Sequence, residues 1–224
     1  MSPPSDTTWR VPLRGVNAYL VDAEGLTLVD AGTPMDAARL CEYVERAGYS
    51  LAEVERVLLT HYDIDHVGAL AGLAEMGLDA PVYASEPDAS FLLGEAKPPL
   101  GNHKGALQRA LGAFVDAPDL SVERIVDGDA VGPFVAYRTP GHTPGHTSFV
   151  HREYGLALVG DLVRGDDGRF GRLPSALAYD ADRNDESIRQ LADHLDGVEV
   201  VGMGHGDPVR SDGGRRFREF AESL

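Results

Sequence analysis

The sequence Leu58-Leu59-Thr60-His61-Tyr62-Asp63-Ile64-Asp65-His66 decides the fold of this chain. A run rich in valine and leucine, which predicts a strand over residues 54–60, leads straight into it. Open α/β folds place reactive groups where a strand ends and a loop begins. Imidazole and carboxylate groups are also the side chains that bind first-row divalent metals in water-activating sites. The motif holds more of these groups than one ion can use, so its density predicts two ions.

Three later strand ends repeat this arrangement. They read Thr139-Pro140-Gly141-His142-Thr143-Pro144-Gly145-His146, Leu158-Val159-Gly160-Asp161 and Val200-Val201-Gly202-Met203-Gly204-His205. Small residues beside the polar one let the backbone turn tightly and aim the side chain inward. One such segment alone is weak evidence, because a histidine at a strand end commonly caps or packs. Four segments in this order are very hard to explain by packing, so we interpret them as one metal centre.

The remaining pattern predicts a mixed sheet layered with helices, in a single domain over residues 1–224. We expect strands at 15–21, 26–29, 54–60, 82–84, 122–126, 134–139, 147–151, 157–159 and 198–201. We expect helices at 36–47, 67–76, 106–115, 187–195 and 215–221. Residues 86–119 are the least regular part and hold four prolines, which indicates a lid or insertion over the pocket.

The charge of the chain limits its partners. Its 20 lysines and arginines against 36 acidic residues give a net charge of −16, the opposite of the basic surface that nucleic acid or anionic lipid requires. Only Lys97 and Lys104 are lysines, and the acidic residues are scattered, as on a protein of a salt-rich cytosol. There is no apolar run of membrane-spanning length and no signal-peptide pattern, so we expect a cytoplasmic protein. The single cysteine, Cys41, is predicted to lie on the inner face of a helix as a buried, inert thiol.

With these four segments, the sequence resembles the metallo-β-lactamase superfamily, in particular its glyoxalase-II-like hydrolase branch. The resemblance also covers Asn17-Ala-Tyr-Leu-Val21 and Thr27-Leu-Val-Asp-Ala-Gly-Thr-Pro34, and extends to His205-Gly-Asp-Pro208. The family motif is His-x-His-x-Asp-His, followed by a Gly-His, a Gly-Asp and a late Gly-His. The fold that the resemblance implies is a four-layer αβ/βα sandwich, in which two mixed β-sheets lie face to face, helices cover the outside and metals bind at one edge.

The resemblance also implies a set of metal ligands. By position, His61 and His142 would hold the first metal, Asp65, His66 and His205 the second, and Asp161 would bridge them. The chain departs from the motif at Asp63, where the family has its second histidine. An anionic ligand there makes the first site harder and shifts its preference from zinc toward manganese or iron. Asp63 is therefore either a ligand or a group that orients a neighbour, and flavodiiron oxidoreductases resemble this chain in having a carboxylate at that position.

The function that we expect is hydrolysis of a small ester, thioester or lactone by a metal-bound hydroxide. The cofactors would be two divalent ions, zinc by default and manganese or iron because of Asp63. Asp65 is the candidate for handling the proton of the leaving group. The alternative is an iron-dependent oxidoreductase, either persulfide dioxygenase-like or diiron. The partner would be a small-molecule substrate, with no nucleic acid and no membrane.

Several other residues receive weaker predictions. His146 competes with His142 as a ligand on spacing alone and otherwise supports the site or contacts substrate, and Asp30 is expected to brace the metal loop. Tyr179 could donate to a substrate oxygen. Solvent-exposed positions are expected for His103, His151 and His194. We do not expect β-lactams as substrates, because no lysine lies near the Gly-His and late motifs along the sequence, or glutathione thioesters, because only 19 residues follow His205.

Overall fold

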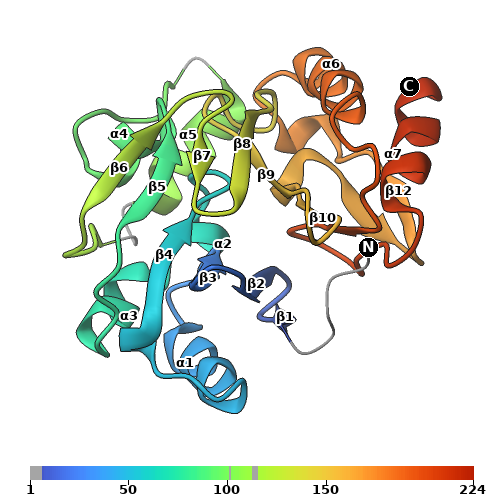
Figure 1. Cartoon of the computed structure of the whole chain (residues 1–224). Coiled ribbons are helices and arrows are strands. Elements are labelled where there is room, and N and C mark those ends of the chain that lie inside the picture. Colours follow the sequence, from blue (N-terminus) through green and yellow to red (C-terminus); the bar gives the residue numbers. More distant parts are fainter. Residues whose placement is uncertain (1–6, 101, 113–115) are drawn as a thin grey trace.

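The computed structural model describes residues 7–100, 102–112 and 116–224. Two β-sheets lie face to face with helices on their outer sides (Figure 1), which is the four-layer αβ/βα sandwich that the resemblance implied. Helices α1 and α3 lie beside the first sheet, and α6 and α7 lie beside the second. The predicted fold class is confirmed.

The first sheet has six strands in the order β1 to β6. They are β1 (Thr8–Pro12), β2 (Asn17–Asp22), β3 (Leu26–Val29), β4 (Val54–Leu58), β5 (Val82–Ser85) and β6 (Val122–Ile125). The first three are antiparallel, and β3 to β6 run parallel. The sequence analysis missed β1, whose run of apolar residues is interrupted by Arg10 and ends in Pro12. An edge strand tolerates a proline because its outer backbone groups have no ladder to complete.

The second sheet has five strands in the order β13-β10-β9-β8-β7. They are β7 (Ala130–Val131), β8 (Phe134–Arg138), β9 (Thr147–His151), β10 (Leu156–Leu158) and β13 (Val200–Gly202). Only the pairing of β10 with β13 is parallel. A small separate hairpin joins β11 (Arg164–Asp166) and β12 (Arg169–Gly171). The sequence analysis missed β7, β11 and β12, because two or three residues are too few to show a strand period.

The α-helices are α1 (Ala37–Arg46), α2 (Ile64–Val67), α3 (Leu70–Glu75), α4 (Asp88–Leu92), α5 (His103–Leu111), α6 (Ala181–Ala192) and α7 (Gly213–Glu222). Short 3-10 turns occupy Leu51–Glu53, Gly160–Leu162 and Ser175–Leu177. Leu40 of α1 and Leu73 of α3 pack on the outer face of the first sheet, and Leu191 and Phe217 pack on that of the second. Each of these four helices, α1, α3, α6 and α7, thus buries apolar side chains against a sheet, as amphipathic helices in layered folds do.

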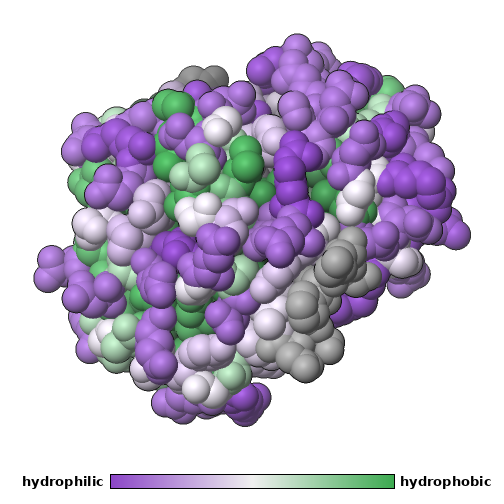
Figure 2. All heavy atoms as spheres, in the orientation of Figure 1, coloured by the Kyte–Doolittle hydropathy of each residue, from purple (hydrophilic) through white to green (hydrophobic). Residues whose placement is uncertain are grey.

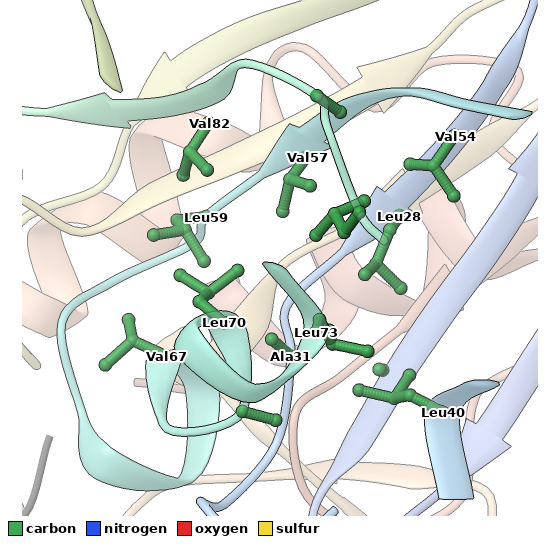
Figure 3. Close-up of a cluster of buried hydrophobic side chains, with 14 of the residues drawn as sticks. Leu28, Ala31, Leu40, Val54, Val57, Leu59, Val67, Leu70, Leu73 and Val82 are labelled. Carbon is green, nitrogen blue, oxygen red and sulfur yellow. The ribbon is translucent and has the colours of Figure 1, made fainter. Parts of the chain in front are cut away.

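Strand β4 connects the apolar layers to the site. Val57 and Leu59 point outward into the cluster with Leu70 of α3 (Figure 3), whereas Leu58 points inward, where it packs with Phe149 between the sheets. Successive side chains of a strand face opposite sides, so a strand buried on both faces reads as a continuous apolar run. This packing places the carboxyl end of β4, and with it the ligand motif, at one edge of the two sheets.

Two predicted helices have different boundaries. The helix predicted over 67–76 corresponds to the shorter α3, and the separate short helix α2 precedes it. The helix predicted over 187–195 starts earlier, at Ala181, where the Asp180 side chain caps it by accepting a hydrogen bond from Arg183 N at 2.9 Å. The helix predicted over 106–115 corresponds to α5, and its last residues, 113–115, lie outside the described ranges.

Two side chains occupy environments that the sequence did not predict. His151, predicted at the surface, is only 3% exposed and stacks on Tyr154 with ring centroids 4.2 Å apart, because strand β9 is buried on both faces. Cys41, predicted to be buried, is half-buried at the edge of the first apolar cluster. His194 is exposed as expected, against the ring of Tyr137.

The surface matches the acidic composition of the chain. Figure 2 shows one face of the molecule covered mainly by hydrophilic residues. Within the described ranges, no helix combines the length and the apolar character needed to cross a membrane.

Candidate metal centre

The structure brings all seven predicted ligand residues to one edge of the sheets. They come from the loops after β4, β8, β10 and β13 and form three groups, in each of which one ligand atom per residue lies within 4.8 Å of the others. The groups are His61 with Asp63 and His142, Asp65 with His66 and His205, and His61 with His66 and Asp161. The first two groups correspond to the two sites that the resemblance implied. That these residues bind metal stays a prediction.

Asp161 lies between the two outer groups. Its Oδ1 atom is 3.4 Å from His66 Nε2, and its Oδ2 atom is 3.1 Å from His205 Nε2 and 3.6 Å from His142 Nε2. The side chain is almost completely buried. Oδ1 thus faces His66 of the second group, and Oδ2 lies between His205 of the second group and His142 of the first. The carboxylate reaches both halves of the cluster, as a bridging ligand would.

Asp30 braces the first loop, as the sequence predicted. Its Oδ2 atom accepts hydrogen bonds from His66 Nδ1 at 2.8 Å and from Thr60 Oγ1 at 2.7 Å. Thr60 Oγ1 in turn lies 2.9 Å from His61 Nδ1. Since a carboxylate only accepts, the hydroxyl of Thr60 donates to Asp30 and Nδ1 of each histidine carries the proton. Nε2 of His61 is then left with a free lone pair facing the centre. Although burial works in the opposite direction, the carboxylates of Asp30 and Asp161 hold the pKa of His66 well above its usual value, so a metal ion would replace the second proton of this ring.

Three buried ligand atoms have no hydrogen-bond partner among the residues that the structure describes. They are His61 Nε2, His66 Nε2 and Asp161 Oδ1, and they form the central group. Burial and the neighbouring His66 lower the pKa of His61 to about 4, so its imidazole is neutral, the form that binds a metal. Buried polar atoms are almost always satisfied in native proteins, and a divalent cation would satisfy all three at once. The donor set therefore fits a metal ion.

His146 positions Asp161 and belongs to none of the ligand groups. Its Nε2 atom accepts a hydrogen bond from Asp161 N at 3.2 Å, so its proton is on Nδ1, which lies 2.8 Å from Thr139 Oγ1. Burial holds the pKa of His146 well below its usual value, which keeps the ring neutral in this role. Of the roles left open for His146, as ligand, support of the site or substrate contact, these hydrogen bonds favour support of the site.

Strand β2 anchors the last ligand loop. The side chain of Asn17 donates to Met203 O at 2.9 Å and to Gly206 O at 2.8 Å, and Tyr19 Oη donates to Met203 O at 2.9 Å. Between these anchors, Gly204 passes so close to the centre that a Cβ atom would lie 2.7 Å from His66 Cε1. Asn17 and Tyr19 of the early Asn-Ala-Tyr segment thus hold in place the loop that carries the late Gly-His motif.

Asp88 links the first two ligand loops, and the sequence analysis missed it. This buried carboxylate accepts hydrogen bonds from Tyr62 N at 2.8 Å, Thr143 Oγ1 at 2.6 Å and Gly145 N at 3.0 Å. Burial raises the pKa of Asp88 to about 6, although the three donors work in the opposite direction. No signal marked this residue, because an aspartate just after a proline reads as an ordinary helix start.

A second group that the sequence analysis missed surrounds Asp63. Lys104 Nζ forms an ion pair with Asp63 Oδ2 and lies 3.1 Å from His142 Nε2. The expectation that no lysine lies near the Gly-His motif is therefore wrong, because folding brings Lys104 next to His142. Gln108 Nε2 donates to Asp63 Oδ1 at 2.7 Å. The hydroxyl of Tyr179, predicted to face a substrate, donates to Gln108 Oε1 at 2.6 Å. These contacts join α5 to the loop after β4 and to the loop before α6. Contacts between such distant segments leave no periodic pattern in the sequence.

The ligand groups open into a cleft of about 240 Å³. Its polar lining residues are Asp63, Asp65, Lys104, Gln108, His142, Asp161 and His205, and its apolar ones are Ile64, Leu107, Leu111 and Leu177. His103, on α5, is exposed as expected, with Nε2 lying 2.6 Å from Ala176 O. The cleft therefore combines the candidate ligands with large apolar side chains, a combination typical of small-molecule sites.

Comparison with known proteins agrees with this geometry. The model of the metallo-beta-lactamase superfamily matches residues 11–205, so the chain belongs to that superfamily. It is 31% identical over 204 residues to hydroxyacylglutathione hydrolase GloC of Haemophilus influenzae, a match that covers 90% of each protein.

Two solved structures share the fold over most of their length. The metallo-beta-lactamase family protein TTHA1429 from Thermus thermophilus has a TM-score of 0.71 and 25% identity, and the match covers 97% of this chain and 78% of that one. TTHA1623, solved in a di-iron-bound form, has a TM-score of 0.68 and 30% identity, over 95% of this chain and 99% of that one.

Proposed function

We propose that this protein is a metal-dependent hydrolase of a small ester, thioester or lactone. The observation that carries the proposal is the overlap of three ligand groups: the central group of His61, His66 and Asp161 shares His61 with one outer group and His66 with the other. Buried ligand atoms of these three central residues lack hydrogen-bond partners among the described residues. Membership of the superfamily and the similarity to GloC, which its name describes as a hydroxyacylglutathione hydrolase, support the reaction class.

In this proposal Asp65, His66 and His205 hold a divalent ion together with Asp161, and zinc is the metal that we expect there. His61, Asp63 and His142 form the ligand set predicted for another ion. A divalent ion at such a site lowers the pKa of bound water and polarises a carbonyl oxygen. Among the protein's own groups, Asp65 is the proposed proton carrier, because its side chain is 31% exposed at the cleft while that of Asp161 is only 5% exposed.

The cleft supports a small substrate with an apolar acyl group. Leu107 and Leu177 are large apolar side chains that remain exposed, and both line the cleft. An acyl chain lying against them would leave its carbonyl group beside Asp161. The net charge of −16 repels nucleic acid, and a cytoplasmic location remains part of the proposal.

The test is to purify the protein in high salt without added metal, measure bound metals by elemental analysis and assay thioesters, esters and lactones. Hydroxyacylglutathione thioesters belong in this panel because of the similarity to GloC. Asp161→Ala should lose most of the bound metal and reduce hydrolysis about 100-fold or more. The matched control Asp193→Ala, at an exposed aspartate, should behave as wild type. Hydrolysis that persists in fully metal-free protein would rule the proposal out.

The second candidate is an iron-dependent oxidoreductase, either persulfide dioxygenase-like or diiron. Asp63 favours it, because a carboxylate ligand suits iron better than an imidazole does. The 30% identity to TTHA1623, solved with two irons, points the same way. Iron in the protein as purified, together with oxygen consumption in the presence of persulfides and no hydrolysis, would favour this candidate over the hydrolase.

A further inference from the structure

The ammonium group of Lys104 lies inside the first ligand group. Lys104 is only 6% exposed, and its Nζ atom pairs with Asp63 Oδ2 and lies 3.1 Å from His142 Nε2. An ammonium group only donates hydrogen bonds, so Asp63 accepts from Lys104. His142 Nε2 lies 3.1 Å from both Lys104 Nζ and Asp63 Oδ2, and it accepts from Lys104 in the tautomer that carries its proton on Nδ1, the form in which Nε2 could bind a metal. The lone pairs that would coordinate a metal ion here are therefore directed at a cation that the chain itself supplies.

Helix α5 is fixed where it delivers Lys104 to this position. The Asn102 side chain caps the helix by accepting a hydrogen bond from Lys104 N at 2.8 Å, and it donates to Tyr179 O at 2.8 Å. At the next position of the helix, a Cβ atom at Gly105 would lie 2.9 Å from the Tyr179 hydroxyl. The close approach at Gly105 and the cap at Asn102 hold the start of α5 against the loop before α6.

Both oxygen atoms of Asp63 are engaged by α5. Oδ2 pairs with Lys104, and Oδ1 accepts a hydrogen bond from Gln108 Nε2 at 2.7 Å. Among the described residues, no lysine or arginine forms an ion pair with Asp65 or Asp161. The two halves of the centre thus differ: an ion in the first group must displace an ammonium group, whereas an ion in the second displaces no side-chain cation of this kind.

We propose that Lys104 is a tethered cation that takes the place of the first metal ion. The protein then binds one divalent ion tightly, at Asp65, His66 and His205 with Asp161, and any ion in the first group is held weakly. This inference rests on the proposed metal centre and deepens it. It also gives a reason for Asp63, since an aspartate is the natural counter-ion of a buried ammonium group, which a neutral histidine could not neutralise.

The test is metal stoichiometry, and the sequence offers a matched control because Lys97 is the other of its two lysines and is exposed. Wild type, Lys104→Met and Lys97→Met are saturated with Zn²⁺, desalted and measured by elemental analysis. We expect about one ion per chain in wild type and in Lys97→Met and about two in Lys104→Met, with affinity for the second ion raised about tenfold or more. A second ion in wild type as tightly bound as in Lys104→Met, or one ion in all three, overturns the inference alone. No ion in any of them overturns the metal centre as well.

A second measurement needs no variant and so does not depend on how Lys104→Met folds. Wild type is acetylated with an N-hydroxysuccinimide ester, and modification of the two lysines is followed by mass spectrometry. With Zn²⁺ at saturation, Lys104 should react at least about tenfold more slowly than Lys97, because it stays buried in its ion pair. If Zn²⁺ makes Lys104 react as fast as Lys97, the ion displaces the ammonium group and the proposal fails.

Discussion

The carboxylate of Asp30 accepts a hydrogen bond from His66 Nδ1 at 2.8 Å, across 36 residues of sequence. Asp30 directly follows β3, and His66 lies on α2 after β4, the neighbouring parallel strand. The backbone of Asp30 is left-handed, with φ of 61°, a conformation that aspartate tolerates better than most residues. Asp30, at the end of β3, thus orients the candidate ligand His66, which follows the neighbouring strand β4.

Asp30→Ala should weaken metal binding about 10- to 100-fold, because His66 and, through Thr60, His61 lose the acceptor that sets their orientation. Affinity can be measured by competition with a chromophoric chelator. The matched control is Asp167→Ala, since Asp167 is exposed and has a left-handed φ of 46°. Both variants carry the backbone cost of alanine, so only the loss of the hydrogen bonds differs. Equal metal affinity of the two variants would contradict the bracing role.

Gly204→Ala should lower the metal content at least about tenfold at limiting metal, with little loss of secondary structure. Its new Cβ atom would lie 2.7 Å from His66 Cε1 and closer still to Asp161 Oδ1, so both side chains must move. Gly171→Ala is the control, because a Cβ atom there meets no atom closer than 3.4 Å. Elemental analysis and circular dichroism of the two variants give the comparison. Full metal content in Gly204→Ala would contradict this prediction, because it would mean that His66 and Asp161 tolerate the added methyl group without losing metal.

Asp88 should make stability depend on pH between about 4 and 6. Burial raises its pKa from 3.8 in the unfolded chain to about 6 in the folded protein. The folded state therefore binds more protons than the unfolded state in this window, and its stability falls as pH rises, by roughly 3 kcal/mol in total. Urea unfolding of wild type and Asp88→Asn over pH 4 to 7.5 measures this contribution. We expect the difference, wild type minus variant, to decrease up to about pH 6 and then to level off. A difference independent of pH would mean that Asp88 stays ionised throughout.

Salt should stabilise the protein strongly. The net charge of −16 repels itself in dilute buffer, and the Debye length falls from about 10 Å at 0.1 M salt to about 3 Å at 1 M. We expect the free energy of unfolding to rise steadily between about 0.1 and 2 M KCl. Replacing four exposed acidic residues by lysine, at Glu75, Asp119, Glu123 and Asp193, halves the net charge and should flatten this rise. If the quadruple variant has the same salt dependence as wild type, self-repulsion is not its cause.

The layered mixed sheet and the strand ends that carry the candidate ligands could be predicted because their signals are local, whereas the four-layer sandwich and the division of the ligands between two sites were implied by the family resemblance. The apolar run Val57-Leu58-Leu59 at the end of β4 reports burial on both faces, and the polar cluster that follows marks the strand end where the motif lies. The glycines before Asp161 and His205 mark tight turns that aim these side chains. Each signal needs only a few neighbouring residues to be visible.

Other features depend on contacts between distant segments. The burial of His151 comes from the layers packed on both faces of β9. The three hydrogen bonds of Asp88 join loops that are more than 25 residues away from it along the chain. Such contacts leave no periodic pattern, because the partners are brought together only when the layers pack.

The sequence by itself thus determined which side chains could bind metal and at which strand ends they lie, because ligand chemistry and strand periodicity are properties of short segments. Only the tertiary structure decided what else enters the centre. Lys104 and His142 are 38 residues apart along the chain, yet the docking of α5 places their nitrogen atoms 3.1 Å apart. The position of a helix depends on many weak contacts summed over the whole core. The motif alone therefore did not show that the ammonium group of Lys104 faces Asp63.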